Sequence, residues 1–229
     1  MTHEMTPSAS GPTARTSGQP VLEGTALALA GILLAMLVAR LMRRVDGIYA
    51  ATVLGAAVVA GYLVADFVSG LVHWFCDRVF EEDTPVIGPL FIEPFREHHR
   101  DPLAMTRHGS LELLGNSALG TAPILAAAWW WADSPFADGL VTAFAASAIA
   151  SNHFHAWAHA AKVPPWVAWL QARWLVLPPA HHARHHRPGH EVAYCMTTGW
   201  MNRWTDGLGV FVGLERILRA LRLPVVDAP

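Results

Sequence analysis

The sequence predicts an all-α integral membrane protein, a four-helix membrane domain with interfacial helices that carry a histidine-rich site for two metal ions. Three observations predict this fold class. Hydrophobic residues make up 53% of the 229 residues and charged residues only 15%, which is unusual for a soluble domain. Four apolar runs follow one another along the chain, as in a multi-pass membrane protein. Twelve of the 13 histidines fall between His73 and His190.

The chain divides into a short polar tail and one membrane domain. Residues 1–20 are rich in Ser, Thr, Gly and Pro without apolar periodicity, so we expect a disordered tail and not a signal peptide. Residues 21–229 form the membrane domain. Its expected spans cover residues 21–39, 48–72, 118–132 and 139–158.

Two further segments are expected to lie at the membrane surface. Residues 165–177 are too short and too rich in tryptophan for another crossing. Residues 207–223 repeat apolar side chains at helical spacing opposite charged ones, which is typical of an amphipathic helix.

Four spans place residues 73–108 and everything after His159 on one side of the membrane. Most arginines lie on that side, which favours the cytoplasm, although three arginines after the first span count against a simple positive-inside rule. We therefore expect the histidines on the cytoplasmic side. The net charge of -2 gives no reason to expect nucleic-acid binding.

The first two histidine clusters surround the end of the second span. His73 and Asp77 are four residues apart and share a helix face, as metal ligands or as an ordinary capped helix end. His98 and His99 are adjacent, so on a helix they address different metals, or one metal and one supporting partner. His108 follows them. A solvated histidine pair is the alternative for this second cluster.

The other two clusters follow the fourth span. Asn152, His155 and His159 align on one helix face, whereas His153 points about 100° away. Aligned polar side chains at membrane depth are costly without a partner, which favours a metal. The last cluster holds two pairs at i, i+4 spacing if it is helical, and its alternative is a surface tract that binds metals adventitiously. Its members are His181, His182, His185, His186 and His190.

The number of imidazoles indicates two metals. At least eight histidines are expected to converge, with no ligand cysteine in any cluster, and one zinc ion uses four ligands or three plus water. Imidazole suits iron, zinc and copper alike. Iron follows only if the reaction is lipid oxidation, because zinc has no redox chemistry.

From about Asp66 to Glu215 the sequence closely resembles the plasmanylethanolamine desaturase family, which includes CarF-type bacterial proteins and, more distantly, a plant plastid palmitate desaturase. The matching stretches are SGLVHWFCD, PFREHHRDP with TRH, the N-x-x-H-x-W-x-H that ends at His159, PPWVAWLQ, and LPPAHHARHH…HE…TTGWMN. The resemblance implies a four-helix membrane desaturase that uses two iron ions, O2 and electrons. Its product would be the vinyl ether of a plasmalogen, formed from an alkyl ether phospholipid.

Carried over to this chain, the histidine boxes of the family fall on His155–His159 and on His182, His185 and His186. His153 and Trp174 depart from the family pattern, which supports leaving His153 out. The predicted ligands are His73, His98, His99, His155, His159, His182, His185 and His186. Further candidates, as ligands or as side chains that support them, are Asp77, His108, Glu112, Asn152, His181 and His190.

Partners and alternatives follow from the same interpretation. The expected partners are a membrane phospholipid and a separate electron donor protein, cytochrome b5-like or ferredoxin-like, since we expect no fused redox domain. The alternatives are an acyl-lipid desaturase or hydroxylase on the same scaffold, and a non-enzymatic membrane regulator that binds metal. A metal transporter fits less well, because the histidines lie at the ends of the spans.

Overall fold

The computed structural model describes residues 18–226, and the regular structure within this range is helical, as the sequence predicts. The expected tail largely falls on residues 1–17, which lie outside the described residues. The elements are α1 (Gln19–Arg44), α2 (Gly47–Arg78), η1 (Gly88–Ile92), α3 (Glu93–Arg100), α4 (Ala104–Arg107), α5 (Ser110–Trp131), α6 (Pro135–His159), α7 (Pro165–Ala172), α8 (Pro179–His182), α9 (Asn202–Gly207) and α10 (Val210–Ala220).

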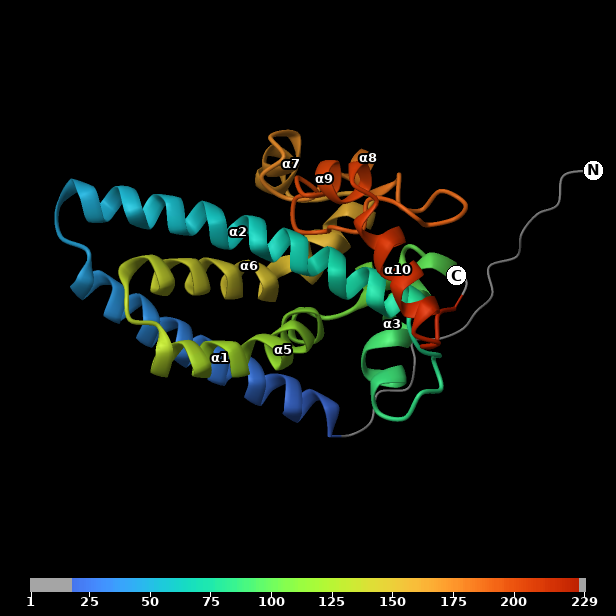
Figure 1. Cartoon of the computed structure of the whole chain (residues 1–229), viewed down its shortest axis with the longest axis horizontal. Coiled ribbons are helices and arrows are strands. Elements are labelled where there is room, and N and C mark those ends of the chain that lie inside the picture. Colours follow the sequence, from blue (N-terminus) through green and yellow to red (C-terminus); the bar gives the residue numbers. More distant parts are fainter. Residues whose placement is uncertain (1–17, 227–229) are drawn as a thin grey trace, which may run out of the picture.

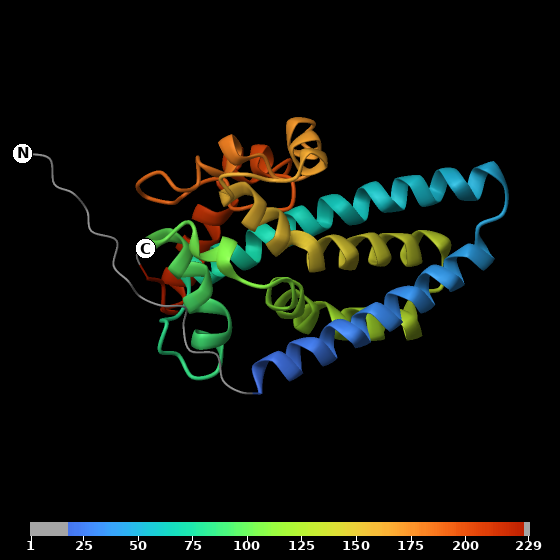
Figure 2. The ribbon, with the colours of Figure 1, turned by 180° about the vertical axis from the view of Figure 1, so that it is seen from behind.

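The four long helices α1, α2, α5 and α6 lie side by side (Figures 1 and 2). Helix α6 packs against all three of the others. The core between them contains Leu33, Leu37, Leu125 and Ile149. At Gly61 of α2, an added Cβ would lie 2.3 Å from a backbone oxygen of α6. Glycine therefore permits the close approach of these two helices.

By length and composition, three helices within residues 18–226 could cross a membrane, namely α1, α2 and α5. The fourth predicted span is a helix of 25 residues, α6, but it is not among the three. Its final turns carry Ser151, Asn152 and three histidines, which lower its hydropathy. Because α6 packs against the other three long helices, less of its surface has to be apolar.

The end of the bundle farthest from the histidines is fixed by ion pairs around Asp138 at the start of α6. This side chain is fully buried, and its carboxylate accepts hydrogen bonds from Arg40 and Arg44 of α1. Arg40 also donates to the backbone oxygens of Ala128 and Trp129 at the end of α5. The cluster therefore joins three helices.

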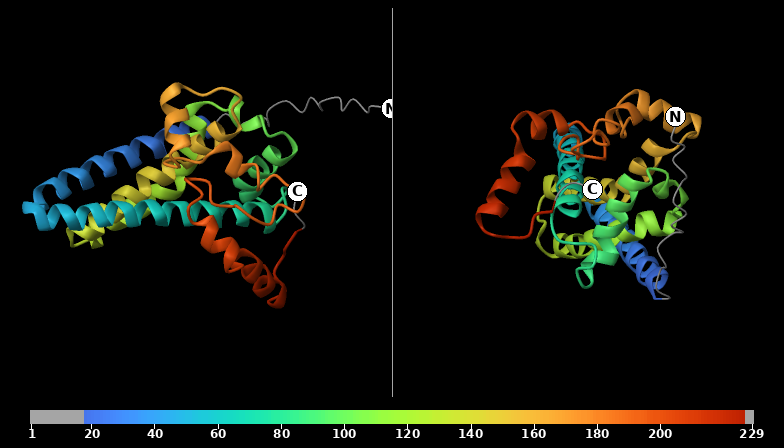
Figure 3. Two further views of the ribbon diagram at one scale, coloured as in Figure 1. Left: turned by 90° about the horizontal axis from the view of Figure 1, so that it is seen from above. Right: turned by 90° about the vertical axis from the view of Figure 1, so that its right-hand side faces the viewer.

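The short helices gather at the opposite end, beside the end of α2 and the start of α5 (Figure 3). The predicted surface segments are shorter than expected, because 165–177 is helical only over α7 and 207–223 only over α10. Helix α1 begins at Gln19, inside the predicted tail, since the proline at position 20 is tolerated in a first helical turn. Trp166 and Trp169 of α7 are exposed, as suits an interfacial helix.

Candidate metal centre

Four separate elements bring the histidines together. His73 lies near the end of α2, His98 and His99 lie on α3, and the pair on α6 occupies its last turns. The last cluster is not one helix, because α8 ends at His182 and turns follow. The i, i+4 prediction for residues 181–190 is therefore wrong in its local structure, although the rings of this segment still meet those of α6.

The first group comprises five ring nitrogens that lie within 4.8 Å of one another, from His98, His155, His159, His182 and His186. The Nε2 atoms of His155, His159 and His182 form a triangle with sides of 2.8, 2.9 and 3.2 Å. The Nε2 atom of His186 lies 3.0 Å from that of His182. Lone pairs that face one another at such distances require a cation or a proton between them.

A second group lies beside the first and includes a carboxylate. It comprises His73, His98, His99 and His185, so His98 is within reach of both groups. The Oδ2 atom of Asp77 lies 3.0 Å from Nε2 of His99, 3.3 Å from that of His185 and 3.4 Å from that of His73. A third group consists of His99, His186 and His190.

Backbone carbonyls fix the orientation of two of these rings. The Nδ1 atom of His73 lies 3.1 Å from the carbonyl oxygen of Tyr194, and that of His185 lies 2.9 Å from the oxygen of Val192. An imidazole that donates from Nδ1 presents the lone pair of Nε2 to the centre. Sequence reasoning missed this role of residues 192–194, because a carbonyl leaves no signal in the side-chain pattern.

Asp66 holds the same loop in place. This buried side chain in the middle of α2 accepts backbone N–H groups from Thr197, Thr198, Gly199 and Met201. Sequence reasoning did not include Asp66 in the site, yet an acid inside an apolar run was the available signal. These contacts fix the loop that carries the Tyr194 carbonyl.

The donor set fits bound metal on three grounds. Both ring nitrogens of His98 are buried without a hydrogen-bond partner within residues 18–226, and so is Nε2 of His73. Burial and neighbouring imidazoles hold the pKa of His98 and His182 well below that of ordinary histidine, so these rings are neutral and able to coordinate. Metal–nitrogen bonds of about 2.0–2.1 Å place ligands about 2.9 Å apart at right angles and about 3.4 Å apart in a tetrahedron.

The spacings of 2.8–3.2 Å in the first group lie closer to the right-angle value. Together with five available nitrogens, they fit side chains that share one metal ion.

Several predicted candidates lie outside the three groups found within the described chain. His108 pairs with Glu112 at 2.8 Å, as their i, i+4 spacing suggests. The Nε2 atom of His181 accepts a hydrogen bond from the amide nitrogen of Asn202 at 2.9 Å. Asn152 donates to the carbonyl of Leu113. His153 is likewise outside the groups, and its ring packs against Trp157.

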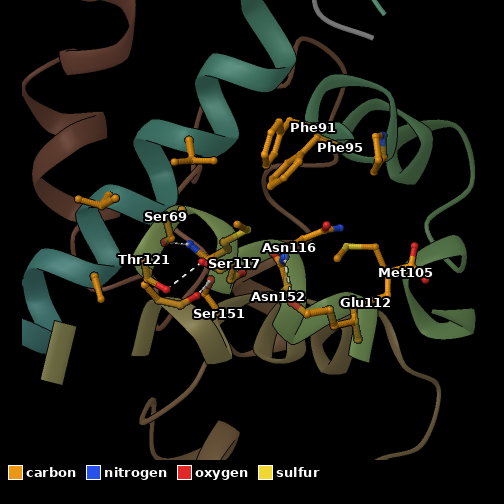
Figure 4. A pocket seen from close by; sticks show the side chains of 18 of the residues that line it. Ser69, Phe91, Phe95, Met105, Glu112, Asn116, Ser117, Thr121, Ser151 and Asn152 are labelled. Carbon is orange, nitrogen blue, oxygen red and sulfur yellow. Dashed lines mark hydrogen bonds between the residues drawn. The ribbon is translucent and has the colours of Figure 1, made fainter. Parts of the chain in front are cut away.

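A cavity of about 330 Å³ adjoins the imidazoles and lies between α2, α5, α6 and the η1–α3 segment (Figure 4). Its walls are mainly apolar, and two sets of polar side chains line it, namely Glu112, Asn116 and Asn152, and Ser69, Ser117, Thr121 and Ser151 (Figure 4). Phe95 lines it, and the Phe95 ring centroid lies 5.3 Å from that of His73. A cavity of this size can hold part of a long hydrocarbon chain.

The comparisons with known proteins agree with this geometry. The model of the "Lipid desaturase domain" family matches residues 62–222, which include all the proposed ligands. The chain belongs to the lipid desaturase family.

Named relatives add detail about the family. The chain is 41% identical to "Plasmanylethanolamine desaturase" of Myxococcus xanthus over 74% of its length, and 40% identical to "Plasmanylethanolamine desaturase 1" of Mus musculus over 72%. It spans 62% and 64% of the length of these two proteins. It is also 37% identical to "Fatty acid desaturase 4, chloroplastic" of Arabidopsis thaliana, over 69% of its length and 49% of that protein. No solved structure matches the chain.

Proposed function

We propose that this chain is a membrane oxidoreductase that forms the vinyl ether double bond of plasmalogens from alkyl ether phospholipids. The observation that carries the proposal is the position of two buried histidine groups beside an apolar cavity. The family match and the two plasmanylethanolamine desaturases at 40–41% identity support the substrate class.

We propose two iron ions as the cofactor. The eight predicted histidines would hold them, with Asp77 and His190 within reach as further donors. Bound iron would supply the activation of O2 that removal of hydrogen from an unactivated carbon requires. Zinc, which has no redox chemistry, would not.

The reaction balances with an external source of electrons. An alkyl chain loses two hydrogens, O2 takes these together with two electrons and two protons, and the products are the alkene and two water molecules. The residues of the chain position the substrate and the metal ligands. The cavity would orient the alkyl chain in an apolar environment, and the Tyr194 and Val192 carbonyls would keep His73 and His185 in the coordinating tautomer.

We further propose that residues 21–229 act as one membrane domain with α6 as its fourth span and with the histidines on the cytoplasmic side. Support comes from the burial of α6 among α1, α2 and α5 and from the arginines near the site. A separate protein, cytochrome b5-like or ferredoxin-like, would deliver the electrons.

The test is expression in a host that lacks plasmalogens, supplied with alkyl ether lipid and followed by lipid mass spectrometry. We expect a vinyl ether product, and its absence from a protein loaded with iron would reject the proposal. A His155→Ala variant serves as the matched inactive control. If the His155→Ala variant folds and still supports the same response of the cell as the wild type, a non-enzymatic regulator that binds metal would be favoured instead.

An acyl-lipid desaturase is the second candidate, because the Arabidopsis relative at 37% identity is named a fatty acid desaturase. The same lipid analysis separates the two. A new double bond in an ester-linked chain, without vinyl ether, would support this second candidate.

A further inference from the structure

A second, smaller cavity of about 180 Å³ opens beside α10 and shares no lining residue with the lipid cavity. Tyr194 forms part of its wall. The ring of Tyr194 also lies against the second histidine group, with its centroid 4.8 Å from that of His185 and 5.6 Å from that of His73. One buried side chain therefore separates this surface cavity from the metal centre.

Further aromatic rings continue outward from Tyr194 within the same cavity wall. The centroid of Phe211 on α10 lies 5.0 Å from that of Tyr194, and that of Trp74 on α2 lies 6.0 Å from Phe211 in a stacked arrangement. All three rings are at most 4% exposed. They form a continuous packed path between the cavity and His185.

The rim of this cavity is charged. Val212, Glu215, Arg216 and Arg219 share one face of α10, because they are spaced at i, i+3 or i+4. The lining contains two arginines, Arg216 and Arg219, and two acids, Glu191 and Glu215. Arg78, which is paired with Glu215, makes the sum of these charges positive. Figure 3 shows α10 extending away from the bundle, where a partner can reach it.

We propose that this α10 face is the docking surface of the electron donor, a small acidic protein that carries one electron at a time. The proposal rests on the proposed function, since only a reaction that consumes electrons needs such a partner. In each encounter the reduced cofactor of the donor loses one electron, which passes by way of Tyr194 to the metal pair. Two encounters supply the two electrons of the balanced reaction.

A membrane surface is the other partner that arginines on a helix can bind. Among the apolar residues that α10 exposes, Ile217 is turned about 100° from Arg216, whereas Val212 lies on the arginine face. The feature that favours a protein partner is the aromatic path behind this face, because such a path has no use in lipid binding.

The test measures binding, independently of catalysis. The full chain in phosphatidylcholine nanodiscs is titrated with the soluble haem domain of cytochrome b5 and, separately, with a plant-type ferredoxin. We expect Arg216→Glu to lower the association rate constant about tenfold at low ionic strength, and the difference to shrink as salt is added. Arg216→Lys should bind like the wild type. Arg43→Glu, the same charge change at the exposed far end of α1, is the control and should have no effect.

A second measurement addresses the path behind the surface. Tyr194→Phe retains the ring, whereas Tyr194→Leu removes it. With equal iron content and equal donor affinity, we expect Tyr194→Leu to slow reduction by the bound donor severalfold and to leave reduction by dithionite unchanged. Tyr194→Phe should behave like the wild type.

Three results would overturn the proposal. They are binding of neither donor to the wild type, equal loss in the Arg216 and Arg43 variants, and an effect of Arg216→Glu that is absent in phosphatidylcholine nanodiscs and appears only when anionic lipid is added to them. Vinyl ether formation with donor binding indifferent to Arg216 would reject the docking surface alone. Binding that depends on Arg216 without any lipid product would reject the proposed reaction alone.

Discussion

The two ends of the four-helix bundle both bury polar side chains, but they differ in whether these side chains find hydrogen-bond partners. At the far end, the Asp138 carboxylate is fully satisfied by Arg40 and Arg44, and Arg40 also bonds two carbonyl oxygens. At the other end, both ring nitrogens of His98 are buried without a hydrogen-bond partner in the described chain.

This difference separates stability from function. A buried group that finds every partner within the chain contributes to holding the helices together, and removing one partner leaves a charge uncompensated. A buried group without a partner costs free energy unless a ligand completes it. The histidine end is therefore the part of the molecule whose structure is incomplete without something bound.

The largest effect is expected from His155→Ala. Its Nε2 atom contacts those of His159 and His182, so its loss opens the first group. We expect iron content to fall and vinyl ether formation to drop by more than about 100-fold, measured by metal analysis and lipid mass spectrometry. Unchanged iron content and activity would show that this group is not the centre.

Asp138→Ala should have the opposite profile. It leaves Arg40, whose side chain is 13% exposed, without its carboxylate, which costs about 3–5 kcal/mol of stability. We expect a lower thermal unfolding midpoint in detergent but unchanged iron content per folded molecule. Asp138→Asn should lower the unfolding midpoint less than Asp138→Ala does. If Asp138→Ala abolished iron binding in folded protein, the two ends would not be independent.

The effect of iron on stability provides a further comparison of the two ends of the bundle. A ligand at 100 times its dissociation constant stabilises the folded state by about 2.7 kcal/mol. Adding ferrous iron to chelated protein should therefore raise the unfolding midpoint of the wild type and of Asp138→Ala by similar amounts. The same addition should do little for His155→Ala. An equal rise of the unfolding midpoint in the wild type, Asp138→Ala and His155→Ala would indicate that iron binds elsewhere.

Much of the fold could be predicted from the sequence. The apolar runs predicted the four long helices α1, α2, α5 and α6, and the spacing of His155 and His159 predicted that both face the same partner. The geometry after α8 could not be predicted, because the chain leaves the helix at His182 and turns bring His186 to the same centre.

Contacts between segments far apart in the sequence could not be predicted either. Asp66 binds a loop 131 to 135 residues away, and no local pattern indicates such a partner. The pairing of Asp138 with Arg40 joins residues 98 apart in the same way. Sequence spacing reports neighbours on one helix, whereas both ends of this bundle are built from several helices.

Asp77→Asn tests the support of the second histidine group. Its Oδ2 atom lies 3.0–3.4 Å from three imidazoles, and the amide keeps the size but not the charge. Loss of such a carboxylate typically lowers metal affinity about 10–100-fold. Iron titration of chelated protein measures the affinity directly, and an unchanged value would leave Asp77 as an ordinary helix-end residue.

The smallest effect is expected from His153→Ala, the matched control for His155→Ala. Both histidines lie on α6, two residues apart, but His153 is outside the metal groups of the described residues and packs on Trp157. Losing that ring contact costs about 1 kcal/mol or less. Iron content and lipid product should match the wild type. A loss of iron as large as in His155→Ala would mean that α6 turns a different face to the metal.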